Sequence, residues 1–314
     1  MNLRDLDYFV ALAKTGHFGR AASLCGVSQP TLSRQVKRLE DDLGGPLVER
    51  CEGLPLTALG REVLPLAQQI TALSADLLAV AGEHSQIHST QLRIGVFPTL
   101  GPFLLPHILG RLQDQLPQVR CSVTEQRTAQ LLTGLHEGRL DVAVVAAPVG
   151  SPGLVCEPAF REDFVLAVGH QDPLAVADDP VDAEELRGSD LILMSEGHCL
   201  RDQVLQVCGS PLLAAGDNAS VRGSALPSGR LQADSMVMLR ELVAAGFGRT
   251  LLPRMSVTDP MPVDPRIVLR EFIAPAPHRD IVLCARPSVF SRPAVLVLLD
   301  VLRSLPSDMV CPSR

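Results

Sequence analysis

Cys199 and Cys208 stand nine residues apart, and they are the pair of side chains in this chain with the clearest potential for chemistry. The segment between them, residues 200–207, has a helix-like pattern. On a continuous α-helix, positions nine apart face opposite sides and lie about 13 Å apart along the axis. Because the Cα atoms of a disulfide come within about 7 Å of each other, the helix must open before these two sulfurs can bond. A redox switch needs such a two-state segment.

Cys199 follows a polar, glycine-containing turn at residues 196–198 and begins the helix-like segment. A thiol at a helix N-terminus faces unpaired backbone N–H groups, and His198 and Arg201 can add positive charge. We therefore expect a lowered pKa and a thiolate that reacts with peroxide. Cys208 follows an apolar turn, and its alternative interpretation is a buried helix cysteine with little reactivity.

Length and composition restrict the class of protein. The 314 residues suffice for two or three domains, and the formal charge of −7 excludes a generally basic nucleic-acid binder. The eight cysteines show no CxxC spacing and the N-terminus has no apolar signal-peptide core, which indicates a reducing cytoplasm. Histidines do not cluster with cysteines at ligand spacing, and no apolar run is long enough for a membrane span. We expect no metal, no cofactor and no membrane partner.

Three helices are predicted in the first 60 residues. Apolar residues at helical spacing end at Gly16, a second helix starts at Phe18, and Ser28 caps a third helix. A helix in the DNA major groove reads bases with its N-terminal side chains. The expected DNA-contacting residues are Gln29, Pro30, Thr31, Ser33, Arg34 and Lys37 of the third helix, and Arg50 in a wing between short strands at 47–50 and 56–60.

The charge of this region leaves an alternative open. Seven basic and seven acidic side chains make the first 60 residues neutral overall. A small all-α packing module would show the same helix pattern, because pairs of helices joined by a glycine turn are common.

A long amphipathic helix is predicted over residues 58–85. Its apolar residues recur at steps of three and four, and they are Leu59, Val63, Leu66, Ile70, Leu73, Leu77 and Val80. The partner expected for this stripe is the same helix of a second subunit. Packing on its own domain is the alternative. The polar residues 84–90 are predicted to form a hinge.

From residue 91 onward, apolar strands alternate with helices. Strands are predicted at 92–96, 119–123, 140–145, 164–168, 191–194 and 250–253, with helices at 99–112 and 128–137. Such alternation favours a parallel sheet covered on both faces, arranged as two α/β halves with a cleft between them. Residues 209–230 and 259–277 are interpreted as a loop and a crossover, and residues after 305 as a loose tail.

Several motifs resemble LysR-type transcriptional regulators over nearly the whole chain. They include Arg20-Ala21-Ala22, Val27-Ser28-Gln29-Pro30, Leu39-Glu40, Gly138-Arg139-Leu140-Asp141 and Val243-Ala244-Ala245-Gly246-Phe247-Gly248. More narrowly, Pro98-Thr99, Leu104-Leu105-Pro106-His107, the segment from Gly197 to Gln203, and Cys208 are similar to the hydrogen-peroxide-sensing OxyR branch of that family.

The resemblance implies a mechanism. Peroxide would oxidise Cys199 to a sulfenic acid, and Cys208 would resolve it to a disulfide. Residues implied to shape the environment of the sulfur are Thr99, Thr128, His198, Arg201 and Asp202. The implied partners are promoter DNA of peroxide-defence genes, RNA polymerase, glutaredoxin or thioredoxin as reductant, and further copies of the chain in a homodimer or homotetramer.

The resemblance also implies a domain plan. A winged helix-turn-helix domain would occupy residues 1–60, and a linker helix with its hinge 61–90. A periplasmic-binding-protein-like region would follow, with Rossmann-like lobe I at 91–163 and 280–305 and lobe II at 164–279. The resulting hypothesis is a peroxide-sensing regulator rather than an enzyme. A metabolite-responsive regulator with spectator cysteines and a two-cysteine peroxidase are the alternatives, and a sulfenic acid at Cys199 alone is an alternative output.

Overall fold

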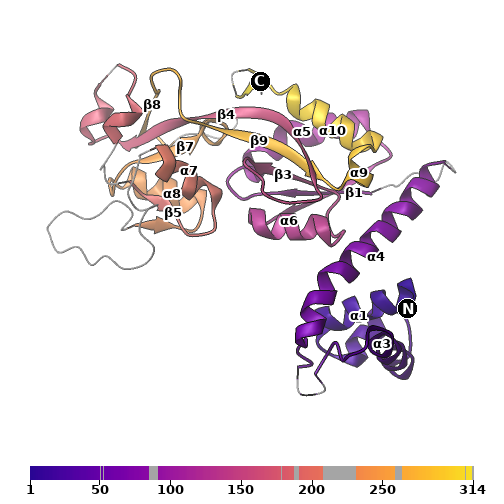
Figure 1. Ribbon diagram of the computed structural model, residues 1–314. Helices are drawn as coiled ribbons and strands as arrows, with labels where there is room; N and C mark the ends of the chain where they lie inside the picture. Colours follow the sequence, from indigo (N-terminus) through magenta and orange to yellow (C-terminus); the bar gives the residue numbers. More distant parts are fainter. Residues whose placement is uncertain are drawn as a thin grey trace. The chain divides into compact units, whose positions relative to one another are not determined.

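The computed structural model describes residues 1–49, 51, 53–84, 91–177, 179–186, 191–207, 231–258, 264–307 and 309–312. Its contacts divide the chain into two compact units. One comprises Met1–Arg93 with Leu132–Asp141, and the other comprises Ile94–Leu131 with Val142–Arg314. Figure 1 shows a helical N-terminal part and a part built on mixed strands and helices.

The three N-terminal helices confirm the predicted pattern. Helix α1 spans Leu3–Thr15 and ends at Gly16, whose φ of 60° is the left-handed conformation that glycine adopts without strain. Helix α2 spans Phe18–Leu24, and α3 spans Gln29–Leu43 with Ser28 as its N-cap. Leu32, Val36 and Leu39 are fully buried in the core of this unit, as expected from their spacing.

The wing is smaller than predicted. Val48 and Leu56 form a single antiparallel bridge rather than two short strands, and helix α4, Ala58–His84, begins where the second strand was expected to continue. Glu40, which is buried on α3, accepts the backbone N–H of Leu47 at 2.8 Å and so ties α3 to the wing. A Cβ on Gly60 would lie 2.0 Å from the Leu47 carbonyl oxygen, which explains why a glycine stands in the first turn of α4.

The larger sheet is mixed, not parallel throughout. Its order is β10-β4-β9-β3-β1-β2, and its strands are β1 Gln91–Val96, β2 Arg120–Glu125, β3 Val142–Ala146, β4 Val155–Gly169, β9 His278–Ala285 and β10 Cys311–Pro312. Strands β1 and β3 are parallel, whereas β9 is antiparallel to both β3 and β4. The prediction of a parallel sheet is therefore correct for β1 and β3 and wrong for β9 and β4.

Helices α5, Gly101–Gln115, and α6, Thr128–His136, connect the first three strands, as predicted. Helix α10, Pro293–Arg303, packs on α5 and β4, and the short α9, Pro287–Phe290, precedes it. In Figure 1 helices α5 and α10 lie next to each other on one side of the sheet.

Strand β4 is shared by two sets of partners. Residues 155–163 pair with β9, while Phe164–Gly169 pair with β7, Thr250–Pro253, and β8, Ile267–Arg270. Around this second part lie β5, Leu193–Met194, and β6, Gln232–Ala233, with α7, Cys199–Val207, α8, Met236–Ala244, and the 3-10 helices Pro173–Ala175, Ala183–Leu186 and Arg254–Val257.

One prediction for the C-terminal region is wrong. The segment interpreted as a loose tail contains β10, which pairs with Phe160 and Arg161 of β4, while the segment interpreted as a crossover contains β8. Met309 and Val310 before β10 are buried, which a loose tail would not achieve. In the part of the chain that the structure describes, no helix is both long and apolar enough to cross a membrane.

Candidate redox site and DNA-reading helix

Cys199 is the first residue of α7, as predicted. The turn before it requires Gly197, whose φ is +85° and whose missing Cβ leaves room for the Arg127 side chain. The backbone N–H of Arg201 donates to the carbonyl oxygen of His198 at 3.0 Å and closes the first turn. The residues up to Val207 are helical, which confirms the helix predicted after Cys199. Cys208 itself lies outside the described residues.

Cys199 is half-buried, and desolvation of its sulfur raises the pKa of the thiol above the ordinary value. Three influences oppose burial: the positive charge of Arg279, a hydrogen bond from the Thr99 hydroxyl, and the backbone N–H groups of Cys199 and Leu200. The prediction of a lowered pKa is therefore wrong, because desolvation outweighs the helix N-terminus. The predicted contribution of backbone N–H groups is confirmed.

Arg279 fixes the orientation of Thr99. Its Nη1 donates to Thr99 Oγ1 at 3.1 Å, and its Nη2 donates to the Thr99 carbonyl oxygen at 3.0 Å. The guanidinium carbon also lies 5.1 Å from the centre of the Phe97 ring, a cation–π distance. Because Thr99 Oγ1 already accepts a hydrogen bond, the proton of its hydroxyl is left to donate to the sulfur.

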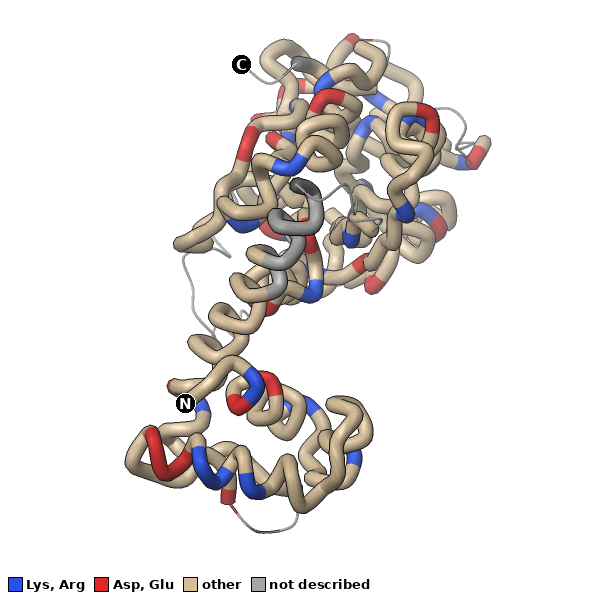
Figure 2. Tube along the Cα trace, turned by 90° about the vertical axis from the view of Figure 1, so that its right-hand side faces the viewer, with Lys and Arg blue, Asp and Glu red and all other residues tan. Residues whose placement is uncertain are grey.

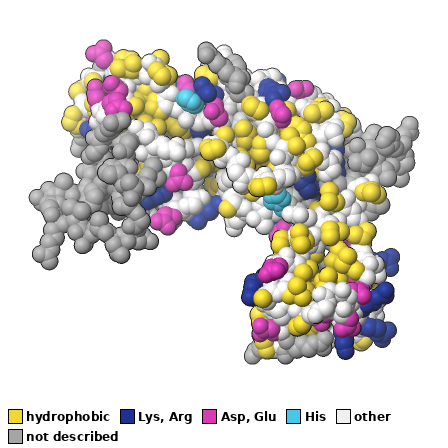
Figure 3. Space-filling model, viewed as in Figure 1, with side chains coloured by type: hydrophobic (Ala, Val, Ile, Leu, Met, Phe, Trp, Pro, Cys, Tyr) yellow, Lys and Arg dark blue, Asp and Glu magenta, His cyan; other side chains and the backbone are white. Residues whose placement is uncertain are grey.

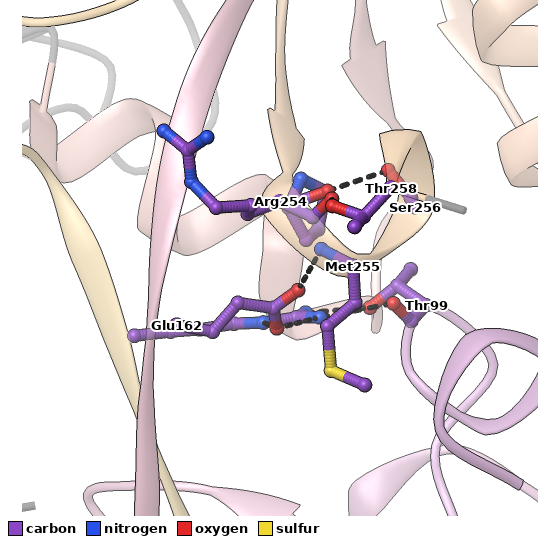
Figure 4. Close-up of polar contacts among 8 residues, drawn as sticks. Thr99, Glu162, Arg254, Met255, Ser256 and Thr258 are labelled. Carbon is purple, nitrogen blue, oxygen red and sulfur yellow. Dashed lines mark hydrogen bonds and ion pairs between the residues drawn. The ribbon is translucent and has the colours of Figure 1, made fainter. Parts of the chain in front are cut away.

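Glu162 holds Arg279 in place from the opposite strand. Glu162 of β4 and Arg279 of β9 are register partners, and Nε of Arg279 donates to Oε2 of Glu162 at 2.7 Å. Both side chains are 0% exposed. The second carboxylate oxygen accepts the backbone N–H of Met255 at 2.9 Å, so Glu162 is bonded on both sides. Figure 4 shows the Glu162 carboxylate directed at the backbone of Met255, with Thr99 on the far side of Met255.

The other predicted residues have different roles. His198 is buried, and its pKa is lowered by burial and by the charge of Arg127, against the effect of Asp234. Its ring is therefore neutral at pH 7 and does not add the positive charge that the sequence suggested. Arg201 donates to the Met194 carbonyl oxygen at 3.2 Å and tethers α7 to β5.

The predicted roles of Asp202 and Thr128 at the sulfur stay predictions. Asp202 is exposed on the first turn of α7, and Thr128 is half-buried at the start of α6. In the described part of the chain, the threonine whose hydroxyl meets the sulfur is Thr99.

Sequence reasoning missed Arg279 and Glu162. They are 117 residues apart, and neither belongs to a motif recognised in the sequence. Their neighbours in the sequence are themselves polar, Arg161 and Asp163 beside Glu162 and His278 and Asp280 beside Arg279, so no local signal marks the two as buried.

A second pair of cysteines was also missed. Cys156 of β4 and Cys284 of β9 are register partners, their Cα atoms lie 4.1 Å apart, and the structure joins them as a disulfide. They are separated by 128 residues, so no local spacing marks them as a pair. Cys51 and Cys121 are exposed free thiols.

The N-terminal end of α3 presents polar side chains to solvent. Gln29, Pro30, Arg34 and Lys37 are exposed, Thr31 and Ser33 are half-buried, and Arg50 lies outside the described residues. The Thr31 hydroxyl lies 2.8 Å from the Ser28 hydroxyl, so Thr31 also serves the cap of α3. Figure 2 shows basic and acidic residues interspersed along this unit, in agreement with its neutral composition.

Helix α4 carries an exposed apolar stripe. Leu66, Ile70, Leu73 and Leu77 are 57%, 39%, 56% and 69% exposed. Their spacing of four, three and four residues is that of a coiled-coil seam. Figure 3 shows hydrophobic side chains on the visible face of the N-terminal unit.

Within the described ranges, no group of three or more His, Cys, Asp or Glu side chains is arranged to hold a metal ion.

Comparison with known proteins matches both units to one family. The model of the "LysR substrate binding domain" matches residues 85–306, and that of the "Bacterial regulatory helix-turn-helix protein, lysR family" matches residues 3–61. The DNA-binding transcriptional dual regulator OxyR of Escherichia coli strain K12 is 37% identical over 305 residues, which cover 97% of this chain and 95% of that protein. A probable hydrogen peroxide-inducible genes activator of Mycobacterium leprae is 39% identical over 286 residues, covering 90% and 88%.

Solved structures agree. Full-length OxyR of Pseudomonas aeruginosa with a cysteine-to-aspartate substitution matches with a TM-score of 0.79 and 32% identity, covering 100% of this chain and 99% of that chain. A cysteine-to-serine mutant of OxyR from Corynebacterium glutamicum, with hydrogen peroxide bound, matches with a TM-score of 0.59 and 29% identity, covering 98% and 95%.

Proposed function

Because this chain belongs to the LysR family of bacterial helix-turn-helix regulators, we propose that it binds promoter DNA and that hydrogen peroxide controls this binding through Cys199. The observation that carries the proposal is the environment of the Cys199 sulfur. It meets the Thr99 hydroxyl, the positive charge of Arg279 and two backbone N–H groups in a half-buried site. The similarity to OxyR proteins over nearly the whole chain supports it.

The first chemical step is oxidation of Cys199. Its thiolate attacks one oxygen of hydrogen peroxide, the O–O bond breaks, and the other oxygen leaves as water with the proton that the thiol gave up. Two electrons pass from sulfur to peroxide. Thr99 and Arg279 stabilise the thiolate and the negative charge that develops on the departing oxygen. Burial keeps the thiol protonated at rest, so reactivity depends on these groups.

The second step joins Cys199 to Cys208. The Cys208 thiol attacks the sulfenic sulfur, water leaves, and a disulfide forms. Since Cys199–Val207 is helical in this structure, closing the disulfide requires α7 to unwind. Unwinding breaks the contact of Arg201 with Met194, which tethers α7 to β5. The effector domain, which is the part of the chain from β1 onward, therefore has a different surface around α7 when it is oxidised.

The DNA-binding part uses the exposed end of α3. Gln29 can offer its amide to adenine, Arg34 can reach guanine or phosphate, and Lys37 suits the phosphate backbone. The apolar stripe of α4 would pair with the same helix of a second copy, giving a homodimer within a homotetramer. Arg50 would contribute a phosphate contact from the wing.

The cycle has further partners. Oxidised protein would engage RNA polymerase at promoters of peroxide-defence genes, and glutaredoxin or thioredoxin would reduce the disulfide in the cytoplasm. Each oxidation switches the regulator once. Turnover of the kind that a peroxidase needs is not part of the proposal.

The test combines two measurements on the full-length protein. Peptide mass spectrometry after one equivalent of hydrogen peroxide should find Cys199 oxidised and joined to Cys208, and the footprint on promoter DNA should change with it. A Cys199→Ser variant should keep its reduced footprint at every peroxide concentration, while Cys121→Ser should behave as the wild type.

Other outcomes would select the alternatives. An unchanged Cys199 thiol, or one footprint in both redox states, would overturn the proposal. DNA binding that depends on a small metabolite in Cys199→Ser would identify a metabolite-responsive regulator. Multiple turnovers per second of peroxide with thioredoxin would identify a peroxidase.

A further inference from the structure

Cys156 and Cys284 lie where two antiparallel strands place them face to face. They are direct register partners in the β4–β9 ladder, and their Cα atoms are 4.1 Å apart. In antiparallel sheets, directly opposed residues of a non-hydrogen-bonded pair have Cα atoms about 4.5 Å apart, which is within reach of a disulfide. The bond between these sulfurs therefore needs no change of fold.

This pair differs from Cys199 and Cys208 in what oxidation does. A bond from Cys199 to Cys208 requires α7 to unwind, because its first residue starts a helix that continues to Val207. A bond between Cys156 and Cys284 locks a strand pairing that already exists. Oxidation of the first pair can change the conformation of α7, whereas oxidation of the second pair can stabilise the existing pairing of β4 with β9.

The two sulfurs of the strand pair are unequally accessible. Cys284 is fully buried, while Cys156 is half-buried near the beginning of β4. Within the described residues, β10 covers the outer edge of β4 at Phe160 and Arg161, not at Cys156. A dissolved oxidant therefore meets Cys156 first, and Cys284 is positioned to resolve the product.

The same ladder carries the residues that contact the redox site. Beyond a bulge between Pro158 and Phe160, it places Glu162 opposite Arg279. Arg279 in turn donates to Thr99 and lowers the pKa of Cys199 against the effect of burial. The register of β4 against β9 thus determines where Arg279 stands.

We propose that Cys156 and Cys284 form a second, reversible redox pair, which a hydroperoxide oxidises to a cross-strand disulfide and which secures the ladder that positions Arg279. In the first step the Cys156 thiolate attacks the hydroperoxide, the O–O bond breaks, and an alcohol or water leaves with the thiol proton. The Cys284 thiol then attacks the Cys156 sulfenic acid, and water leaves as the disulfide forms. The two sulfurs together lose two electrons, which reduce one hydroperoxide.

The formation of the Cys156–Cys284 disulfide does not depend on the proposed function. Its effect on the rate of Cys199 oxidation rests on the proposed function. Coupling carried through a packed element typically changes a rate or an equilibrium by roughly 2- to 30-fold. We expect Cys199 to react with hydrogen peroxide faster by a factor in this range when the strand pair is oxidised.

The first experiment maps the pair. Full-length Cys199→Ser protein is reduced with dithiothreitol, freed of reductant, treated with hydrogen peroxide or cumene hydroperoxide, alkylated and digested without reduction. Mass spectrometry should find the peptides of Cys156 and Cys284 joined, and dithiothreitol should separate them again without denaturant. Two free thiols after stoichiometric oxidant, or a bond that resists dithiothreitol in the folded protein, would each overturn the proposal.

The second experiment measures the coupling. The rate of Cys199 oxidation is compared between wild type with the strand pair oxidised and Cys156→Ser, with Cys121→Ser as the control for an exposed cysteine on β2. A slower rate in Cys156→Ser alone supports the proposal, and equal rates in all three overturn the coupling. Should Cys199 fail to react at all, the proposed function fails, while the mapping of Cys156 and Cys284 still decides the pair. Circular dichroism of each variant shows that it is folded.

Discussion

Replacing Glu162 with glutamine should strongly destabilise the effector domain. Glu162 and Arg279 are both fully buried, and the substitution keeps the shape of the side chain while removing the charge that balances the guanidinium. Breaking one partner of a buried ion pair costs about 3–5 kcal/mol, because the remaining charge stays desolvated. For a domain of 150–250 residues each kcal/mol corresponds to roughly 2–4 °C in Tm, so the expected loss is about 6–20 °C.

The matched control is Glu157→Gln on the same strand. Glu157 pairs with Arg303 at 3.4 Å, but the two side chains are 45% and 43% exposed. Exposed pairs contribute about 0–1 kcal/mol, so this substitution should lower Tm by about 4 °C at most. Both variants replace a glutamate by a glutamine, so the difference between their Tm values measures the effect of burial alone.

The assay is thermal unfolding of the reduced full-length protein, followed by circular dichroism and calorimetry, with the transition of the effector domain analysed. A second readout is the rate of Cys199 oxidation by peroxide, which should fall in Glu162→Gln because Arg279 loses its anchor. The double variant Glu162→Gln with Arg279→Met should recover part of the lost stability, since no buried charge is left alone, but not the rate. Equal Tm values for Glu162→Gln and Glu157→Gln would show that the buried ion pair contributes no more stability than the exposed one.

Four further predictions follow from other parts of the chain. The rate of Cys199 oxidation should rise with pH through 9.0 without a plateau at neutral pH, because burial raises the thiol pKa above that value; stopped-flow kinetics that level off near pH 7 would contradict this. The pKa of His198 is lowered from 6.5, so its stabilising contribution is present above that pH and is lost as pH falls through the folded-state value; urea midpoints between about pH 7 and pH 5 should fall less in His198→Phe than in wild type. Gln29→Ala should cost about 1–3 kcal/mol in specific DNA binding and relax the preference at one base pair, measured by competition binding at fixed salt. Leu73→Glu should separate the dimer in analytical ultracentrifugation, whereas Gln69→Glu, at an exposed polar position of the same helix, should leave it intact.

The sequence predicts features that depend on near neighbours. Gly16 ends α1 because glycine accepts the left-handed conformation, and Ser28 begins α3 because its hydroxyl caps the helix. The start of α7 at Cys199 was predictable for the same reason: its signal lies in the preceding turn, where Gly197 takes a positive φ. The family resemblance supplied Thr99, which local patterns alone do not single out.

What the sequence does not reveal depends on distant partners. Arg279 meets Glu162 and Thr99 across 117 and 180 residues, and Cys156 meets Cys284 across 128. The register of β4 against β9 brings these pairs together, and that register could not be predicted because neither residues 155–163 of β4 nor β9 belong to a strand that the sequence predicts. The pKa of Cys199 was misjudged for a related reason: flanking residues indicate charge, whereas burial depends on the whole fold.

Strand β4 belongs to two sheets along one unbroken backbone. An extended strand already rises about 3.3 Å per residue and has almost no slack left to stretch. Asp163 is the last residue of β4 that pairs with β9, and Phe164 is the first that pairs with β7. No residue lies between them that could act as a flexible hinge. The two halves of the effector domain therefore cannot draw apart along this axis when the redox state changes. The two halves can only rotate relative to each other about the axis of β4. An oxidised form should therefore differ from this one by a rotation of the halves and by the unwinding of α7, while the distance between the halves along β4 stays nearly constant.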